Sequence, residues 1–548
     1  MNNFSFFNRE NSKKELQSTE FDILIIGGGI TGAGIALDAA SRGMKVALIE
    51  KNDFASGTSS KSTKLIHGGL RYLKQFDFWL VKEVGTERAI VHKLAPHLVI
   101  PEKMILPLIE GGTYGSWLTS IGLKVYDILA SVEGDDKRKM LDKEEALEKE
   151  PLLPEEILNG AGYYAEYRTD DARLTIEILK TASQYDAQII NYVEATEFIY
   201  ENKRVVGAKV TDVFSGETLD IKSKYVVNAA GPWVDELRQI NNSKIGKRLH
   251  LTKGVHLVVA HEKLPVKQSV YFDIPDGRMM FAIPRGKVTY FGTTDTNYQE
   301  DKNNVETSIV DALYLIEAVN NMFPEITLTL EDIESSWAGL RPLIHEEGKS
   351  ASELSRKDEI FVSDTKLISI AGGKLTGYRK MAERIVDLVA KKMRRRFEIE
   401  FDPIQTEEIV LSGGPFQNFK SVKLYIKQVF KRMESEGFTK QDAAYLVYNY
   451  GKQTSTILDK FDELSEENNE KKLVKAEVWF TIHHEMTCTP TDFFMRRTGR
   501  LFFDKPSVDR NKEFVLEEFA NYFNWEKEDL EFHNQELEDK IQLAVHFQ

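Results

Sequence analysis

The sequence predicts an α/β fold that carries a separate, mostly antiparallel sheet and ends in a helical domain. Residues Phe21–Ala36 comprise an apolar run, a glycine-rich turn and a run of small residues, which predicts a strand, a turn and a helix. From about Leu249 to Thr296, short β-rich runs are broken by Pro, Gly and Asp, a pattern typical of antiparallel strands. From Gln417 onward the chain is strongly charged and helix-rich.

The first segment completes a βαβ dinucleotide-binding pattern. Gly27, Gly29 and Gly32 have the G-x-G-x-x-G spacing, and a second apolar run ends at Glu50, eighteen residues after Gly32. Gly27 permits the tight turn, Gly29 lets the backbone approach a pyrophosphate, and Gly32 lets the helix pack closely. The carboxylate can accept hydrogen bonds from ribose hydroxyls. Strand, turn, helix, second strand and acid agree, so the chain is predicted to bind an adenine dinucleotide.

Size and composition limit the class of protein. A chain of 548 residues is too long for one core and predicts two to four domains. The 42% hydrophobic and 29% charged content fits a globular protein, and the net charge of −14 argues against general nucleic-acid binding. The single cysteine, Cys488, cannot form an internal disulfide and is expected to be buried. Met1–Glu20 lacks the apolar segment of a secretory signal, and no apolar run is long enough to span a membrane, so we expect any membrane contact at the surface.

The domain order follows from two later segments that resemble the first turn. An apolar strand leads into Ala229–Gly231, and the glycine pair of Gly372–Tyr378 opens a helix that runs to about Arg396. One nucleotide domain is therefore expected to be interrupted by the antiparallel sheet. The expected ranges are a polar N-terminal tail (1–20), three parts of the cofactor-binding domain (21–110, 166–248 and 356–400), cap or substrate-domain helices (111–165), a substrate-binding domain (249–355) and a helical C-terminal domain (401–548).

Four segments carry a family resemblance. The loop Glu50–Leu73, the run Trp337–Pro342, the turn Gly372–Thr376 and the segment Arg496–Thr498 closely resemble those of the FAD-dependent, quinone-linked glycerol-3-phosphate dehydrogenases. The resemblance covers about 21–503. It implies a FAD-binding fold like that of glucose oxidase and D-amino-acid oxidase, with an antiparallel-sheet substrate domain and a helical C-terminal domain.

Two features distinguish this chain within that resemblance. Lys61 stands where the family loop more often has Arg, so the cation is kept but bidentate pairing is lost. The related α-glycerophosphate oxidases usually carry an extra insert of some tens of residues. This chain is too short to hold that insert, which favours the dehydrogenase.

The resemblance implies that the C2 alcohol of sn-glycerol 3-phosphate is oxidised to dihydroxyacetone phosphate, with a hydride passing to FAD and electrons then to a quinone. The implied catalytic residues are His67, as the base, with Arg341 and Lys374; His256 and His345 are weaker candidates for the base. The implied substrate-binding residues are Arg71, Tyr72, Arg341, Arg356 and Lys374. The implied cofactor-binding residues are Gly27, Gly29, Ile30, Thr31, Gly32, Glu50, Lys51, Ser56, Thr58, Ser59, Ser60, Lys61, Val193, Ala230, Gly231, Gly373, Lys374, Leu375 and Thr376.

Other functions remain open at this point. An oxidase would pass electrons to O2 and release H2O2. A binding protein that holds a flavin would not turn over substrate. An amine or amino-acid oxidase of the same fold would need residues that bind a substrate carboxylate, in place of a cationic cluster for phosphate. Any single Arg could be a surface charge, and His67 could be a structural histidine. The pair His483 and His484 with Glu485 lacks metal-ligand spacing with any partner, and a helix surface is favoured.

The resemblance also implies a peripheral position on the cytoplasmic face of the cell membrane and favours a homodimer. The five cations of Lys391–Arg396 could attract anionic lipid, or could simply lie favourably at a helix C-terminus. The apolar face of Trp117–Leu129 could lie in the membrane interface, although a core-facing helix is favoured.

Overall fold

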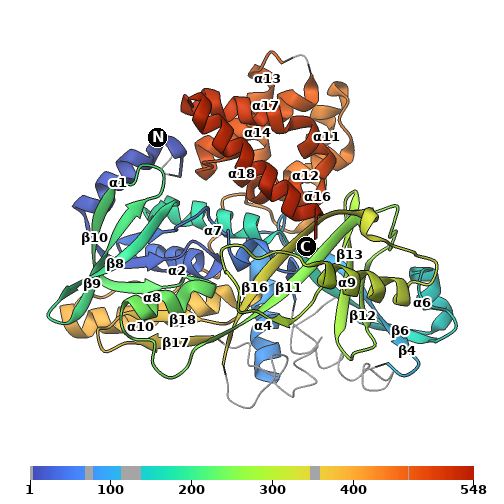
Figure 1. Ribbon diagram of the computed structural model, residues 1–548, viewed down its shortest axis with the longest axis horizontal. Coiled ribbons are helices and arrows are strands. Elements are labelled where there is room, and N and C mark those ends of the chain that lie inside the picture. Colours follow the sequence, from blue (N-terminus) through green and yellow to red (C-terminus); the bar gives the residue numbers. More distant parts are fainter. Residues whose placement is uncertain (1–3, 68–77, 113–137, 346–357, 467, 548) are drawn as a thin grey trace.

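Two sheets and a group of C-terminal helices make up the molecule (Figure 1). The computed structural model describes residues 4–67, 78–112, 138–345, 358–466 and 468–547. Among these residues, no helix combines the length and apolar character needed to cross a bilayer. The apolar helix expected within Trp117–Leu129 lies outside the described residues.

The first sheet has the parallel centre expected from the βαβ pattern. Its central strands are hydrogen-bonded in parallel, and a strand at one edge and a hairpin against β10 are antiparallel. The order is β17 (Glu359–Val362), β18 (Ile368–Ala371), β10 (Thr218–Asn228), β1 (Glu20–Ile26), β2 (Val46–Ile49) and β7 (Gln188–Ile190), with the hairpin of β8 (Val193–Glu201) and β9 (Arg204–Asp212).

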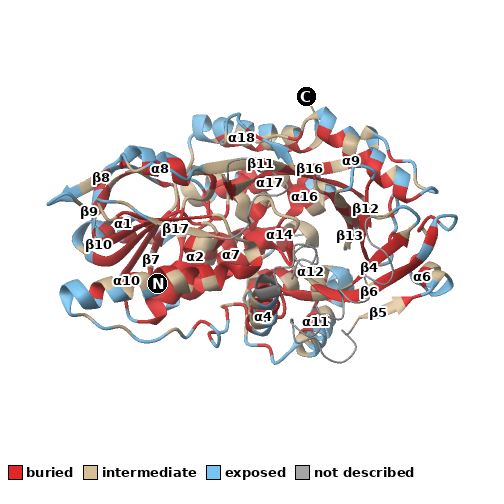
Figure 2. Cartoon of the chain, turned by 90° about the horizontal axis from the view of Figure 1, so that it is seen from below, coloured by how far each residue is buried: buried red, intermediate tan, exposed pale blue. Residues whose placement is uncertain are grey.

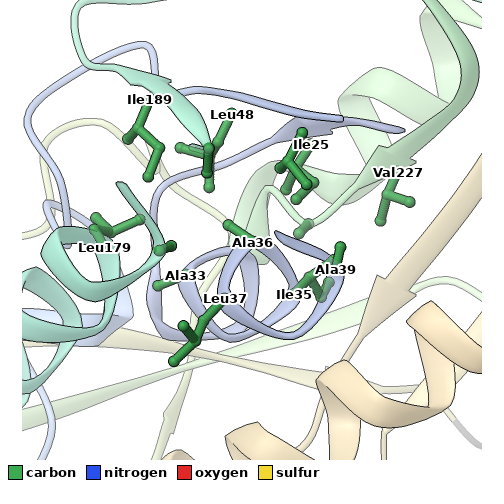
Figure 3. Close-up of a cluster of buried hydrophobic side chains, with 14 of the residues drawn as sticks. Ile25, Ala33, Ile35, Ala36, Leu37, Ala39, Leu48, Leu179, Ile189 and Val227 are labelled. Atoms are coloured by element: carbon green, nitrogen blue, oxygen red, sulfur yellow. The ribbon is translucent and has the colours of Figure 1, made fainter. Parts of the chain in front are cut away.

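Small residues bring the first helix close to this sheet. Helix α2 (Ile30–Ser41) is buried along nearly its whole length and packs against α7 (Asp171–Gln184) and α10 (Tyr378–Phe397). Figure 3 shows Ala33 and Ala36 of α2 among apolar side chains of the neighbouring strands and α7. Because alanine adds little bulk, the start of α2 can be held next to the turn after β1.

The second sheet is mostly antiparallel, as the sequence predicts, although β12 and β4 pair in parallel. Helix α9 (Ile309–Met322) packs on it, and α6 (Lys143–Lys149) packs on its far strand. Its path is β15 (Thr296–Asn297), β11 (Leu249–Ala260), β14 (Val288–Gly292), β13 (Met279–Arg285), β12 (Ser269–Asp273), β4 (Ile100–Ile109), β6 (Leu158–Arg168) and β3 (Leu65–Ile66), with β16 (Ile333–Ile344) on β11 and β5 (Lys139–Leu141) on β6.

Three strands of this sheet, β4, β5 and β6, differ from the expected domain ranges. Strand β4 belongs to the second sheet although it falls within 21–110. Strand β5 and most of β6 lie in the range 111–165, where helices were expected, and β6 continues to Arg168. Pro101 and Pro107 in β4, and Gly160 and Gly162 in β6, disfavour strands, so local composition conceals both elements.

The N-terminal residues form a packed helix where a polar tail was expected. Helix α1 (Arg9–Ser18) buries Leu16 and lies against β10 and β7. Arg9 donates hydrogen bonds to Asp212 at 3.0 Å and to the Asn191 backbone oxygen at 2.6 Å. These polar side chains can be buried because they are paired.

The C-terminal part is helical, as predicted. Its helices, coloured orange to red, form a cluster at the top of Figure 1, and α16 and α18 contact β16 of the second sheet. Figure 2 shows exposed residues on α18 and buried residues along α2 and α7. The helices are α11 (Phe419–Met433), α12 (Lys440–Tyr450), α13 (Thr454–Glu463), α14 (Asn469–Glu485), α15 (Pro490–Asp492), α16 (Arg500–Phe503), α17 (Lys505–Phe523) and α18 (Lys527–Val545); α4 (Phe78–Leu94) and α8 (Val234–Ile240) belong to the body.

Candidate functional site

A cavity of about 250 Å³ opens at the carboxyl ends of β1, β10 and β18. These parallel strands end at the same edge of the sheet, where ligands of such sheets usually bind. The segments that follow them, 27–31, 229–233 and 372–375, line the cavity. Fifteen of the predicted cofactor residues line it: Gly27, Gly29, Ile30, Thr31, Glu50, Lys51, Ser56, Thr58, Ser59, Val193, Ala230, Gly231, Gly373, Lys374 and Leu375.

The glycine turn has the close approaches that a pyrophosphate site needs. Gly27 has a φ of +120°, and a Cβ on it would come within 2.5 Å of the Ala229 carbonyl oxygen. A Cβ on Gly32 would come within 1.9 Å of the Gly27 carbonyl oxygen. Gly32 therefore lies behind the cavity, where it brings α2 against the turn. The helix begins at Ile30 beside the cavity, so its N–H groups and positive dipole end fit the phosphates of FAD.

Glu50 is held by two backbone N–H groups at the end of β2. Its Oε2 accepts a hydrogen bond from Gly28 at 2.7 Å, and its Oε1 accepts one from Asn52 at 2.9 Å. Burial raises the pKa of the carboxyl, and the hydrogen bonds from Asn52 and Gly28 oppose that rise. Because a carboxylate has about four acceptor positions, the two oxygens can still accept hydrogen bonds from ribose hydroxyls.

The serine-rich loop contributes only some of its predicted residues to this cavity. Ser59 Oγ accepts a hydrogen bond from the Ile30 N–H at 2.9 Å, and Thr58 Oγ1 donates one to the Leu340 carbonyl at 2.7 Å. Ser60 is buried and donates to the Gly57 carbonyl at 3.5 Å. Lys61 lines a second cavity on the other side of the loop. The short turn Thr58–Ser60 sends successive side chains in different directions, which separates Ser59 from Lys61.

The second glycine turn places a lysine in the cavity wall. Gly373 has a φ of +83°, and a Cβ on it would come within 2.4 Å of Met381 Sδ. The next residue, Lys374, lines the cavity. Thr376 lies behind the wall and donates a hydrogen bond to the His67 carbonyl at 3.4 Å. The His67 segment therefore lies beside the lysine turn.

Arg341 is fixed by three acceptors next to the cavity. Its guanidinium donates to the Thr294 carbonyl at 3.0 Å, to Asp295 at 3.1 Å and to Thr293 Oγ1 at 2.8 Å. The neighbouring residue, Pro342, lines the cavity. A Cβ on Gly254 of the adjacent strand would lie 2.2 Å from Arg341 Nη2, so glycine leaves the space that the guanidinium occupies.

The two weaker histidine candidates have different surroundings. His256 stacks on Trp337 with ring centroids 4.9 Å apart, and its Nε2 lies 3.0 Å from Thr63 Oγ1. Burial, reinforced by Arg341 and Lys64, lowers the pKa of His256 well below its ordinary value. The surroundings of His256 therefore favour the neutral form of its imidazole. The His345 ring lies 6.3 Å from the His250 ring. The His67 ring lies 6.1 Å from the ring of Phe281.

The sequence did not reveal the residues that position Arg341 or complete the cavity wall. Thr293 and Asp295, which hold Arg341, follow a strand and carry no pattern of their own. Gly254, an isolated glycine inside a strand, is a signal of close approach that could have been used. Trp233 also lines the cavity and donates a hydrogen bond to Asn303 at 3.1 Å, while Lys51 Nζ lies 4.5 Å from its ring centroid.

Several remaining predictions concern other regions. Arg71, Tyr72 and Arg356 lie outside the described residues. Among the residues that are described, none form a group of three or more His, Cys, Asp or Glu that could hold a metal ion.

Glu485 is fully buried in ion pairs with Arg173 and Lys180, whereas a helix surface was favoured for it. Cys488 is buried, as expected, and burial raises the pKa of its thiol.

Comparisons with known proteins cover both parts of the chain. A family model described as FAD dependent oxidoreductase matches residues 22–374, and one described as the C-terminal domain of alpha-glycerophosphate oxidase matches residues 404–530. The chain is 50% identical over 545 residues to the aerobic glycerol-3-phosphate dehydrogenase of Bacillus subtilis (strain 168), covering 99% of this chain and 98% of that protein. It is 48% identical over 546 residues to the protein of the same name from Staphylococcus aureus (strain USA300), with the same coverage. A crystal structure of the glycerol-3-phosphate dehydrogenase from Bacillus halodurans complexed with FAD matches with a TM-score of 0.85 and 43% identity, covering 100% of this chain and 99% of that chain.

Proposed function

The chain belongs to the family of the FAD-dependent aerobic glycerol-3-phosphate dehydrogenases, and on that premise we propose that it oxidises sn-glycerol 3-phosphate to dihydroxyacetone phosphate. The observation that carries the proposal is a cavity suited to FAD that has Lys374 in its wall and Arg341 beside it. Lys374 lines this cavity, and Arg341 directly precedes Pro342 in its wall. Cationic side chains in and beside the cavity suit a substrate that carries a phosphate dianion.

When bound, FAD would supply the hydride acceptor, and the residues of this chain would bind, orient and deprotonate the substrate. We assign the phosphate to Arg341, whose guanidinium is held in a fixed orientation by Thr293, Thr294 and Asp295. Arg71, Tyr72 and Arg356 complete the phosphate site in this proposal. Lys374 would stabilise negative charge at the reacting end.

His67 is proposed to take the proton from the C2 hydroxyl. Imidazole is suited to accept a proton at neutral pH. The hydrogen bond from Thr376 to the His67 carbonyl supports this role, because it ties the histidine segment to the turn that carries Lys374. His256 is a poorer candidate, since its ring is packed against Trp337 and its Nε2 is engaged by Thr63.

We further propose that the electrons pass to a membrane quinone and that the protein lies on the inner face of the cell membrane, as a homodimer. The exposed cations at the end of α10 support the membrane contact. Reduction of O2 to H2O2, as in an oxidase, is the alternative.

The reaction can be tested by mixing the purified holoprotein with glycerol 3-phosphate under anaerobic conditions. Oxidised flavin absorbance should bleach, and dihydroxyacetone phosphate should form in equal amount. Unphosphorylated glycerol at the same concentration is the control and should bleach the flavin far more slowly. Failure to bleach with a fully loaded protein would contradict the proposed reaction.

A second experiment distinguishes the acceptors. Turnover is measured with a soluble quinone analogue and with air-saturated buffer, while H2O2 is recorded. The dehydrogenase proposal predicts quinone-dependent turnover with little H2O2. Release of H2O2 at a rate that matches quinone turnover would establish the oxidase instead.

A further inference from the structure

A second cavity, of about 370 Å³, lies on the far side of the serine-rich loop. Ser56, Gly57 and Thr58 line both cavities, so at this point the two cavities are separated by the thickness of one chain segment. The other walls come from β16, from the segment 302–307 and from α18. The second cavity is therefore built at the junction of the cofactor loop, the second sheet and the C-terminal helices.

Lys61 provides a cation in this cavity without a charge partner. It is half-buried, and its amine makes no hydrogen bond or ion pair with any residue that the structure describes. Burial, together with the nearby cations Lys540 and Arg496, lowers the pKa of the Lys61 amine to about 8. The described charges that act on this lysine are thus of its own sign.

The other charged groups of the cavity do not neutralise the charge of the Lys61 amine. Arg496 is already paired with Asp53 at 2.6 Å and Asp492 at 2.5 Å. Lys302 is paired with Glu236. Glu306 and Glu536 also line the cavity, yet the groups that shift the pKa of the Lys61 amine are the cations Lys540 and Arg496.

Lys540 adds a second cation to the same cavity. It lies on α18, lines the same cavity and forms no ion pair in the described part of the chain. Two partly buried ammonium groups that line one cavity and repel each other are unfavourable, and an anion bound to both removes that cost. Ammonium groups bind phosphate well, because each offers several donors to the phosphate oxygens.

We propose that this second cavity is a binding site for a small phosphate-bearing anion, held between Lys61 of the cofactor loop and Lys540 of α18. The site goes beyond the proposed reaction and does not depend on it. Because Ser56–Thr58 line both cavities, an anion bound to Lys61 would restrain the loop that faces the cofactor cavity. Occupancy would thereby couple the C-terminal helices to cofactor retention.

Trace acetylation of the holoprotein tests the site, with inorganic phosphate as the probe and chloride at matched ionic strength as the control. The labelling of Lys61 is compared with that of the exposed Lys391 by mass spectrometry. Pairing with an anion should raise the pKa of Lys61 by about one unit, so its labelling at pH 8 should fall up to about tenfold. Lys391 should be unaffected by the exchange of chloride for phosphate.

Two variants locate the bound phosphate. Lys540→Met should raise the half-effective phosphate concentration about tenfold, whereas Lys527→Met, near the start of the same helix, should not. Arg341→Ala should leave the protection of Lys61 intact, because Arg341 belongs to the substrate site. Any one of three results would overturn the proposal. These are unchanged labelling of Lys61 in phosphate, loss of Lys61 protection in Arg341→Ala, and equal effects of Lys540→Met and Lys527→Met.

Discussion

Arg341 shows how a charged side chain can be ready for its ligand before the ligand arrives. Three acceptors, Thr293, Thr294 and Asp295, hold one side of the guanidinium, and Gly254 leaves it the space. A guanidinium offers five N–H donors, and the contacts with these acceptors use both of its terminal nitrogens. Its orientation is set by the fold, so little side-chain freedom remains to be lost on binding.

Replacing Arg341 should therefore affect the phosphate-bearing substrate selectively. Charge-assisted hydrogen bonds contribute about 1.5–3 kcal/mol, so Arg341→Ala should lower kcat/KM for glycerol 3-phosphate roughly 10- to 100-fold. The already slow oxidation of glycerol should change much less. Arg341→Lys is the matched control and should recover part of the loss. Equal losses on both substrates would mean that Arg341 does not contact the phosphate.

His67 is predicted to affect the chemical step and not cofactor binding. His67→Asn keeps a polar side chain of similar size but cannot accept the proton at neutral pH. Stopped-flow absorbance should show flavin reduction slowed by roughly 10²- to 10⁴-fold, the usual contribution of a general base. The ratio of FAD to protein should stay the same, because Thr376 bonds the His67 backbone and not its ring. An unchanged reduction rate would exclude His67 as the base.

At the scale of elements, a buried ion network fixes the loop that leaves β2. Asp53 is fully buried and accepts hydrogen bonds from Arg496 at 2.6 Å, from Arg497 at 2.7 and 2.8 Å, and from Asn191 at 3.1 Å. The two arginines belong to the turn Phe493–Arg497 of the C-terminal part. The C-terminal domain thus holds the start of the loop that supplies Ser56–Ser59 to the cofactor cavity.

This network predicts a specific acid sensitivity. Burial alone would raise the pKa of Asp53, but Arg497 and Arg496 outweigh burial and lower it to about 2. An Asp in an unfolded chain titrates near about 3.9. The carboxylate therefore contributes its full stability above about pH 4, and that contribution is lost as the pH falls from about 4 towards 2.

Asp53→Asn should consequently lower the unfolding temperature strongly at pH 7, since breaking a buried pair costs about 3–5 kcal/mol. The difference from wild type should shrink as the pH falls below about 4. The Asp53→Asn variant should also release FAD more readily than wild type on ultrafiltration. Asp387→Asn, which removes the exposed partner of Arg42, is the control and should cost about 1 kcal/mol or less. A difference that stays constant from pH 7 to 3 would contradict the pKa argument.

The elements differ in how far the sequence predicts them, for physical reasons. The turn around Gly27–Gly32 was predictable because its constraints are local: spacing, absent Cβ atoms and an adjacent helix. Strands β4 and β6 were not, because pairing in the second sheet stabilises them despite prolines and glycines. The contact between Asp53 and Arg497 joins residues 444 positions apart, and no local pattern encodes such a pairing. Of the site, the turns could be predicted, whereas the fixed orientation of Arg341 and the burial of Lys61 needed the three-dimensional fold.

At the scale of the whole molecule, cations from separate elements gather at the far end of α10. Lys391 and the run Arg394–Arg396 are exposed, and Phe397 beside them is 36% exposed. Burial, with Lys366 and Arg204 as nearby cations, lowers the pKa of Lys392. The net charge of the chain is −14, so this cluster is a local reversal of sign, even with Arg394 paired to Glu400 at 3.1 Å. Such a patch next to an exposed aromatic ring suits an anionic membrane surface.

Membrane contact through this patch can be tested with vesicles. Each cation near an anionic surface contributes about 1 kcal/mol, so replacing Arg394, Arg395 and Arg396 by Gln should weaken binding roughly hundredfold. Co-sedimentation with vesicles containing anionic lipid measures this, with neutral vesicles as a reference. The control replaces the exposed Lys420, Lys423 and Lys427 of α11 by Gln, which changes the net charge equally. Because the attraction is electrostatic, wild-type binding should also fall as salt is raised. Equal binding by both triple variants would mean that net charge, and not the end of α10, determines any membrane association.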